Sequence, residues 1–145
     1  MIKKSIESGI ILPIIVVLGI FINFNSFLRG RLPSLAEFFV SVAYLVIWVF
    51  VFRFFLRNKK YIQIFLSTIL WLLTCLASTV TVYAIISDAI VVFHLPLSIL
   101  FITPIYGLEL LFNHKYMILI FISIISCCFS YFGVKFLITQ RKKEY

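Results

Sequence analysis

The chain has 145 residues, of which 63% are apolar and only 12% are charged, and its mean hydropathy is +1.18. A water-soluble globular domain could not bury this much apolar surface, so the composition excludes that class and predicts a single polytopic membrane domain, 1–145. The net charge of +8 lies in small groups of cations at the ends of apolar runs, which is typical of anchoring to anionic lipid headgroups and gives no support for nucleic-acid binding.

The first apolar run, 9–28, contains no charged residue and follows a short basic segment. It is long enough to cross a hydrocarbon core of about 30 Å and longer than the apolar core of a cleavable signal peptide. We therefore expect it to be retained as a membrane anchor. Asn23 and Asn25 near its end could bind a polar group, but asparagines at a membrane surface are more often simply solvated.

The second run, 35–56, begins after Pro33 and Ser34. A proline near a helix start removes no intrahelical hydrogen bond, and the Ser34 side chain can cap the first turn. Arg53 lies within this run but only about one turn from the basic segment that follows it. Its side chain can therefore extend to the membrane surface.

The third run, 61–87, carries a stripe of polar side chains. At 100° per residue the members of the stripe fall within an arc of about 60° on a helix. We expect this face to point away from lipid, either for helix packing or as a polar pathway for a solute. The members of the stripe are Gln63, Ser67, Thr74, Ser78 and Thr81.

The last run, 116–138, has a comparable face of small residues, which falls within about 80°. Small and hydroxylated side chains let two helices approach closely and exchange hydrogen bonds. We therefore expect the small-residue face to meet the polar stripe of run 61–87. The face consists of Ser123, Ser126, Ser130 and Gly133.

Residues 89–113 are apolar enough to form a further span, but Pro96 and Pro104 interrupt them. The charge distribution favours four spans over five, because with four spans ten of the thirteen Lys and Arg residues lie on the cytoplasmic side. We therefore expect an all-α integral membrane protein with a four-helix bundle, in which 88–115 is an interfacial or re-entrant segment on the outer side that leans on the bundle. The ten cytoplasmic cations are Lys3, Lys4, Arg53, Arg57, Lys59, Lys60, Lys135, Arg141, Lys142 and Lys143, and the three outside are Arg29, Arg31 and Lys115.

The three cysteines, Cys75, Cys127 and Cys128, all lie within predicted spans. They lack the Cys-x-x-Cys spacing of thiol oxidases, and adjacent cysteines on a helix point about 100° apart. We expect all three to be buried, small apolar side chains.

Asp88, His94, Glu109 and His114 gather on the predicted outer segment and form a possible outer-face polar site. Their spacings of 6, 15 and 5 residues match no known ligand pattern for zinc, so we predict no metal, no cofactor and no catalytic residue. The plainer interpretation is that these side chains are in contact with water.

No sequence motif defines a biochemical reaction. We expect a small multi-pass plasma-membrane protein with cytoplasmic termini, acting as a noncatalytic partner, regulatory or immunity-type subunit that docks on another membrane protein. An oligomeric small transporter or channel subunit is the alternative, and an enzyme acting on lipid through the outer-face residues is a third. The Ile, Phe and Lys content resembles that of membrane proteins from AT-rich bacterial genomes, which indicates a bacterial cell membrane.

Overall fold

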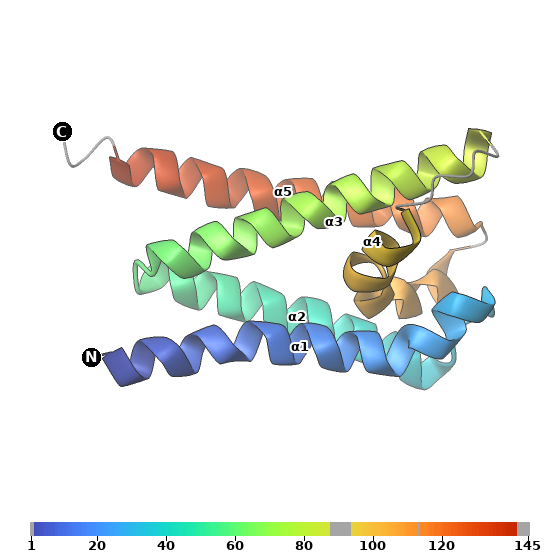
Figure 1. Cartoon of the computed structure of the whole chain (residues 1–145), viewed down its shortest axis with the longest axis horizontal. Coiled ribbons are helices and arrows are strands. Elements are labelled where there is room, and N and C mark those ends of the chain that lie inside the picture. Colours follow the sequence, from blue (N-terminus) through green and yellow to red (C-terminus); the bar gives the residue numbers. More distant parts are fainter. Residues whose placement is uncertain (1, 88–93, 113, 142–145) are drawn as a thin grey trace.

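The computed structural model describes residues 2–87, 94–112 and 114–141, and every element within these ranges is a helix (Figure 1). The expectation of an all-α fold is therefore confirmed. Four helices are long, and between the third and fourth of them lie one short α-helix and one 3-10 helix. The long helices are α1 (Ile2–Arg29), α2 (Leu35–Arg57), α3 (Tyr61–Ser87) and α5 (Lys115–Arg141), and the short ones are α4 (His94–Phe101) and η1 (Thr103–Leu111).

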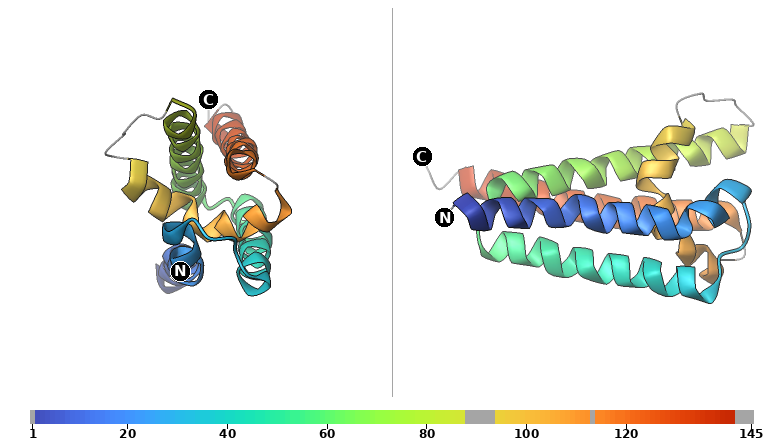
Figure 2. Two further views of the ribbon diagram at one scale, coloured as in Figure 1. Left: turned by 90° about the vertical axis from the view of Figure 1, so that its right-hand side faces the viewer. Right: turned by 60° about the horizontal axis from the view of Figure 1, so that its bottom comes forward.

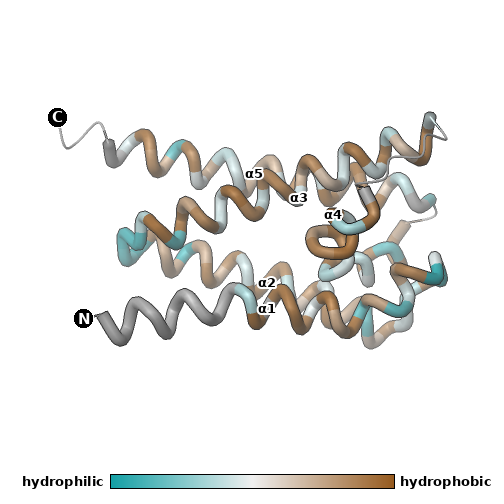
Figure 3. Tube along the Cα trace, viewed as in Figure 1, coloured by the Kyte–Doolittle hydropathy of each residue, from teal (hydrophilic) through white to brown (hydrophobic). Residues whose placement is uncertain are grey.

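Three of the helices are long and apolar enough to cross a membrane, namely Leu35–Arg57, Tyr61–Ser87 and Tyr116–Thr139. Their bounds agree closely with the second, third and fourth apolar runs of the sequence. A shorter apolar stretch, Val16–Arg29, forms the second half of α1. Hydrophilic residues gather at the helix ends and connections, while the middle parts of α2, α3 and α5 are mostly hydrophobic (Figure 3). These features are compatible with a membrane-embedded protein.

The predicted cap of the second run is confirmed. Ser34 precedes α2 in extended backbone, and its Oγ accepts a hydrogen bond from the Glu37 backbone N–H at 3.3 Å. The Glu37 carboxylate accepts one in return from the Ser34 N–H at 2.5 Å, which completes a capping box. At the other end of α2, Asn58 closes the helix and Lys59 adopts a positive φ of 49°, which reverses the chain into α3.

The long helices run antiparallel in chain order, so the start of α1, the α2–α3 turn and the end of α5 lie at the same end of the molecule (Figures 1 and 2). The α4–η1 segment, residues 94–111, lies at the opposite end. There η1 packs on α1 and α2, whereas α4 packs mainly on α3. The closest helix pair is α3 with α5, while α1 and α2 each contact η1 more than they contact each other.

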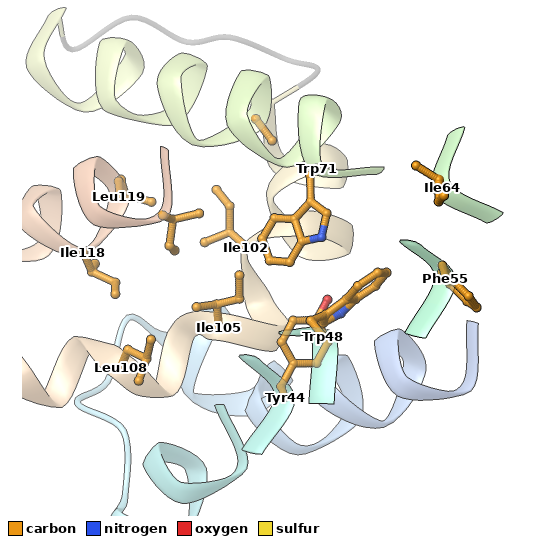
Figure 4. Packing of buried hydrophobic residues seen from close by; sticks show 12 residues of the cluster. Tyr44, Trp48, Phe55, Ile64, Trp71, Ile102, Ile105, Leu108, Ile118 and Leu119 are labelled. Atoms are coloured by element: carbon orange, nitrogen blue, oxygen red, sulfur yellow. The ribbon is translucent and has the colours of Figure 1, made fainter. Parts of the chain in front are cut away.

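A row of aromatic rings joins α2 to α3 and α5, and its two tryptophans, Trp48 and Trp71, lie in the buried core (Figure 4). Trp48 meets Trp71 edge to face, with ring centroids 5.5 Å apart, and Trp71 stacks on Phe129 at 4.4 Å. Phe52 also meets Phe129, edge to face, with ring centroids 5.6 Å apart. Such pairs contribute roughly 0.5–1.5 kcal/mol each beyond the area they bury, so this row helps to hold α2 against α3 and α5.

The prediction of buried cysteines is wrong for two of the three. Cys127 and Cys128 are exposed on α5, and Cys75 on α3 is half-buried. The reason is that α5 packs chiefly on α3, which leaves the remaining faces of α5 largely uncovered within the described residues. In a bilayer these thiols would face lipid, where an apolar side chain needs no protein cover.

Candidate functional site

The polar stripe of α3 and the small-residue face of α5 lie against each other. The hydroxyl groups of Ser78 and Ser123 are 2.7 Å apart, within hydrogen-bond distance. Gly133 approaches α3 so closely that a Cβ at this position would overlap the side chain of Thr68, a residue outside the predicted stripe. The stripe also reaches α4, because Thr81 Oγ1 lies 2.7 Å from Ser98 Oγ.

All four hydroxyls of the stripe donate a hydrogen bond to a backbone carbonyl of their own helix, Ser78 to the oxygen three residues earlier at 2.9 Å. Ser67, Thr74 and Thr81 each donate to the carbonyl oxygen four residues earlier, at 2.7–2.9 Å. Gln63 at the end of the stripe is half-buried. Side chains that bond to their own backbone need no further polar partner, which favours packing over a solute pathway for this face.

The small-residue face of α5 differs from the stripe in its hydrogen bonds. Ser126 and Ser130 are buried on it, and within the described residues their hydroxyl oxygens have no hydrogen-bond partner. Small side chains suit this position because they allow the close approach of α3.

A second set of buried polar groups lies where η1 meets α1 and α2, and we call it the η1 cluster. The Asn23 side-chain amide donates to the Pro104 carbonyl oxygen and to Ser41 Oγ, both at 3.3 Å. Ser41 Oγ in turn donates to the same carbonyl at 3.1 Å. The Gly107 N–H donates to Ser41 Oγ at 3.0 Å. The cluster consists of Asn23, Ser26, Glu37, Ser41, Pro104, Tyr106, Gly107 and Glu109.

These contacts correct the expectation that Asn23 is solvated. Asn23 is fully buried, whereas Asn25 is exposed as expected. Through Asn23 and Ser41, α1 and α2 together hold the carbonyl oxygen of a proline 81 residues further along the chain than Asn23. The η1 cluster is thus the attachment of the α4–η1 segment to the first two helices.

Glu37 is 8% exposed, and the two oxygens of its carboxylate each have a partner. One oxygen accepts from Ser26 Oγ and the other from the Ser34 N–H, both at 2.5 Å. Arg31 lies next to this pair, with its guanidinium 3.4 Å from Ser26 Oγ. The Glu37 carboxylate therefore closes the connection between α1 and α2 as well as capping α2.

Glu109 is only 2% exposed, so the expectation that it is in contact with water is wrong. The cause is that η1 turns into the bundle and does not lie on its surface: all residues from 102 to 109 are buried. Within the described residues its Oε2 has no hydrogen-bond partner. Burial raises the pKa of the neighbouring Tyr106 phenol, and hydrogen bonding to Glu109 and the charge of this carboxylate raise it further.

The other members of the predicted outer-face site are not brought together with Glu109. His114 is exposed and stacks on Tyr116, with ring centroids 5.3 Å apart. His94 begins α4, but its side chain lies outside the described residues, as does Asp88 altogether. Within the described part of the chain no three His, Cys, Asp or Glu side chains are placed to hold a metal ion.

A groove of about 460 Å³ opens between α2 and α5. Phe52 is buried within it, while Arg53 and Phe132 are exposed along it. The two described carboxylates that are buried, Glu37 and Glu109, belong to the η1 cluster at the other end of the molecule. The groove is lined by Val49, Phe52, Arg53, Leu56, Cys128, Phe129 and Phe132.

The sequence reasoning missed most of the η1 cluster. One signal was available, since Asn23 and Ser26 are three residues apart and Glu37 and Ser41 four apart, so each pair shares a helix face. The groups that these faces bind are the Pro104 carbonyl and the Gly107 N–H. Both belong to the backbone, so the residue types at these positions do not indicate the contact.

Compared with known protein families, with curated proteins and with solved structures, the chain matches none of them. Its function therefore has to be inferred from the geometry.

Proposed function

We propose that the chain is a plasma-membrane protein of a bacterial cell with four spans, α1, α2, α3 and α5, and with both termini in the cytoplasm. The α4–η1 segment is then a re-entrant pair that enters from the outer side. Two observations support this arrangement. The eight residues of α4 cover only about 12 Å, too little to cross a bilayer, and the many buried residues of η1 lean on α1 and α2.

We further propose that it acts as a noncatalytic partner subunit that docks in the membrane on another protein. The observation that carries this proposal is the groove between α2 and α5, an apolar cleft with a single guanidinium along it. Its occupant is a transmembrane helix of the partner that bears a carboxylate in its cytoplasmic half. Aromatic rings of the groove supply the packing surface, and Arg53 supplies the charge.

Charge complementarity favours this occupant over an apolar helix. The guanidinium of Arg53, near the cytoplasmic edge of the membrane, attracts a carboxylate that lies at the same depth. Glu37 cannot serve, because it lies sixteen residues before Arg53 on α2, or about 24 Å along the helix. An acidic group brought in by a partner would fill this role and would fix the orientation of the docked helix.

Site-specific photocrosslinking in native membranes tests the proposal. A photoreactive phenylalanine analogue at Phe132, in the groove, should capture one partner protein, and Arg53→Gln should abolish the capture. The matched control is the same analogue at Phe50, which is 68% exposed on α2 outside the groove and should capture lipid only.

A charge exchange then separates specific docking from chance contact. Arg53→Glu should be rescued when the carboxylate of the captured helix is replaced by arginine. Capture of a second copy of the chain, capture that is indifferent to Arg53→Gln, or failure of the rescue would contradict the proposal.

A small transporter or channel subunit is a second candidate, because Glu109 is buried with one oxygen that has no hydrogen-bond partner in the described structure. Ionisable groups buried at membrane depth commonly mark ion or proton pathways. Vesicles reconstituted with the protein should then conduct protons under a membrane potential. Glu109→Gln should remove this flux, while His114→Ala, at an exposed residue, should keep it. Vesicles without flux above the protein-free level would exclude this candidate.

A further inference from the structure

Two thiols from different helices face each other on the α3–α5 pair. Cys75 Sγ and Cys127 Sγ are 3.3 Å apart, although the residues are separated by 52 positions in the chain. Both are free thiols, one half-buried and the other exposed. Each lies near the middle of its helix, since α3 spans Tyr61–Ser87 and α5 spans Lys115–Arg141.

The packing on either side holds the two thiols in register. One turn further along α3, Ser78 pairs with Ser123 at 2.7 Å. About one turn earlier, Trp71 stacks on Phe129 at 4.4 Å. Each step of three or four residues forward on α3 is thus matched by two to four residues backward on α5, as in a regular antiparallel pair. The meeting of the thiols is part of this register and does not depend on one flexible side chain.

We propose that Cys75 and Cys127 form a redox-active pair that closes to a disulfide when it meets a membrane-permeant two-electron acceptor such as a quinone. The two S–H bonds break and one S–S bond forms. The two electrons and two protons pass to the acceptor, so that a quinone leaves as the hydroquinone. The new bond fastens α3 to α5 at the centre of the pair.

The position of the thiols selects the kind of oxidant. Both α3 and α5 contain stretches long and apolar enough to cross a membrane, so the middle of each lies in hydrocarbon when the helices span. A water-soluble, charged oxidant does not enter this region. A lipid-soluble acceptor reaches Cys127 directly, because this side chain is exposed on the surface of α5.

Cys128 provides a matched control on the same helix. It is exposed like Cys127 but has no thiol partner within the described structure. Protein in native membranes is treated with a fully ring-substituted, short-chain quinone, denatured, alkylated with N-ethylmaleimide and weighed intact. All three cysteines of the untreated chain should be alkylated. After oxidation only Cys128 should be alkylated, because the other two thiols are joined in the disulfide. Ferricyanide, which stays in water, should leave the labelling unchanged.

The variants make the outcome specific. Cys128→Ser should lose all alkylation on oxidation, whereas Cys75→Ser and Cys127→Ser should keep their two remaining thiols under both conditions. The oxidised wild type should also unfold at a higher temperature, because the bond constrains the unfolded chain. Three labelled thiols after quinone treatment, a disulfide that includes Cys128, or dimers linked between chains would each overturn the proposal.

Discussion

Replacement of Gly107 by alanine should detach η1 from α2. A Cβ at this position would lie 2.5 Å from the Glu37 carbonyl carbon and 2.6 Å from Ser41 Oγ, and it would overlap the Glu37 carbonyl oxygen. Ordinary contacts of this kind begin near 3.4 Å, so η1 has to move away from α2 by roughly 1 Å. A backbone carbonyl within a helix cannot rotate aside as a side chain can.

The magnitude follows from the hydrogen bonds that this movement lengthens. The Gly107 N–H bond to Ser41 (3.0 Å), the Ser41 bond to Pro104 (3.1 Å) and the Asn23 bond to Pro104 (3.3 Å) all cross the same boundary. Each contributes about 0.5–1.5 kcal/mol net. Together with the steric strain, we expect Gly107→Ala to lower the free energy of unfolding by about 3 kcal/mol.

Thermal unfolding of the detergent-solubilised protein, followed by size-exclusion chromatography, measures this effect. For a chain of this size a change of about 3 kcal/mol corresponds to a midpoint lowered by roughly 6–12 °C. Gly133→Ala is the matched control, because the three atoms nearest to its Cβ would all belong to the side chain of Thr68. Gly133→Ala should lower the thermal midpoint by less than Gly107→Ala does. The double variant with Thr68→Ala should largely restore the wild-type midpoint.

A midpoint within about 2 °C of the wild type for Gly107→Ala would refute the reasoning. It would mean that η1 is free to shift on α2 and that the η1 cluster does not hold it. Equal losses for the two glycine variants would likewise show that the contact with the Glu37 backbone has no special role.

Three further changes have defined outcomes in the same assay. Ser34→Ala removes the capping box of α2 and should lower the free energy of unfolding by about 1 kcal/mol. Trp71→Ala removes the ring stacked on Phe129 and should lower it by about 3–5 kcal/mol. The raised pKa of Tyr106 gives a stability contribution that is fully present below about pH 10 and lost above it, so the wild type should lose more stability than Tyr106→Phe as the pH rises past 10.

The long helices could be predicted from the sequence because the residues that end each helix lie next to it in the chain. An apolar run ends where charged residues or a proline begin, as at Pro33 and at Arg57. The Ser34 cap is equally local, because donor and acceptor are only three residues apart. Such signals depend on the solvent and the helix itself, and no distant contact is needed to interpret them.

The candidate sites depend on distant contacts, and the sequence predicted only some of these contacts. Matching faces of small and hydroxylated residues indicated that α3 packs on α5, but periodicity alone does not pair individual side chains, so the Cys75–Cys127 pair and the Asn23–Pro104 contact were not predicted. For Glu109 the charge of the side chain suggested a loop in contact with water. The residue is instead buried, because η1 packs into the bundle. Burial of a charged residue is decided by the packing around it.

The four-span arrangement sets the orientation proposed for the protein, and reporter fusions test it most directly against five spans. Reporters active on only one side of the membrane are fused after Lys60, in the α2–α3 connection, and after Tyr145 at the C-terminal end. Four spans predict that both fusions report the cytoplasmic side. Reporters on opposite sides would mean that the α4–η1 segment crosses the membrane, and the four-span account would be wrong.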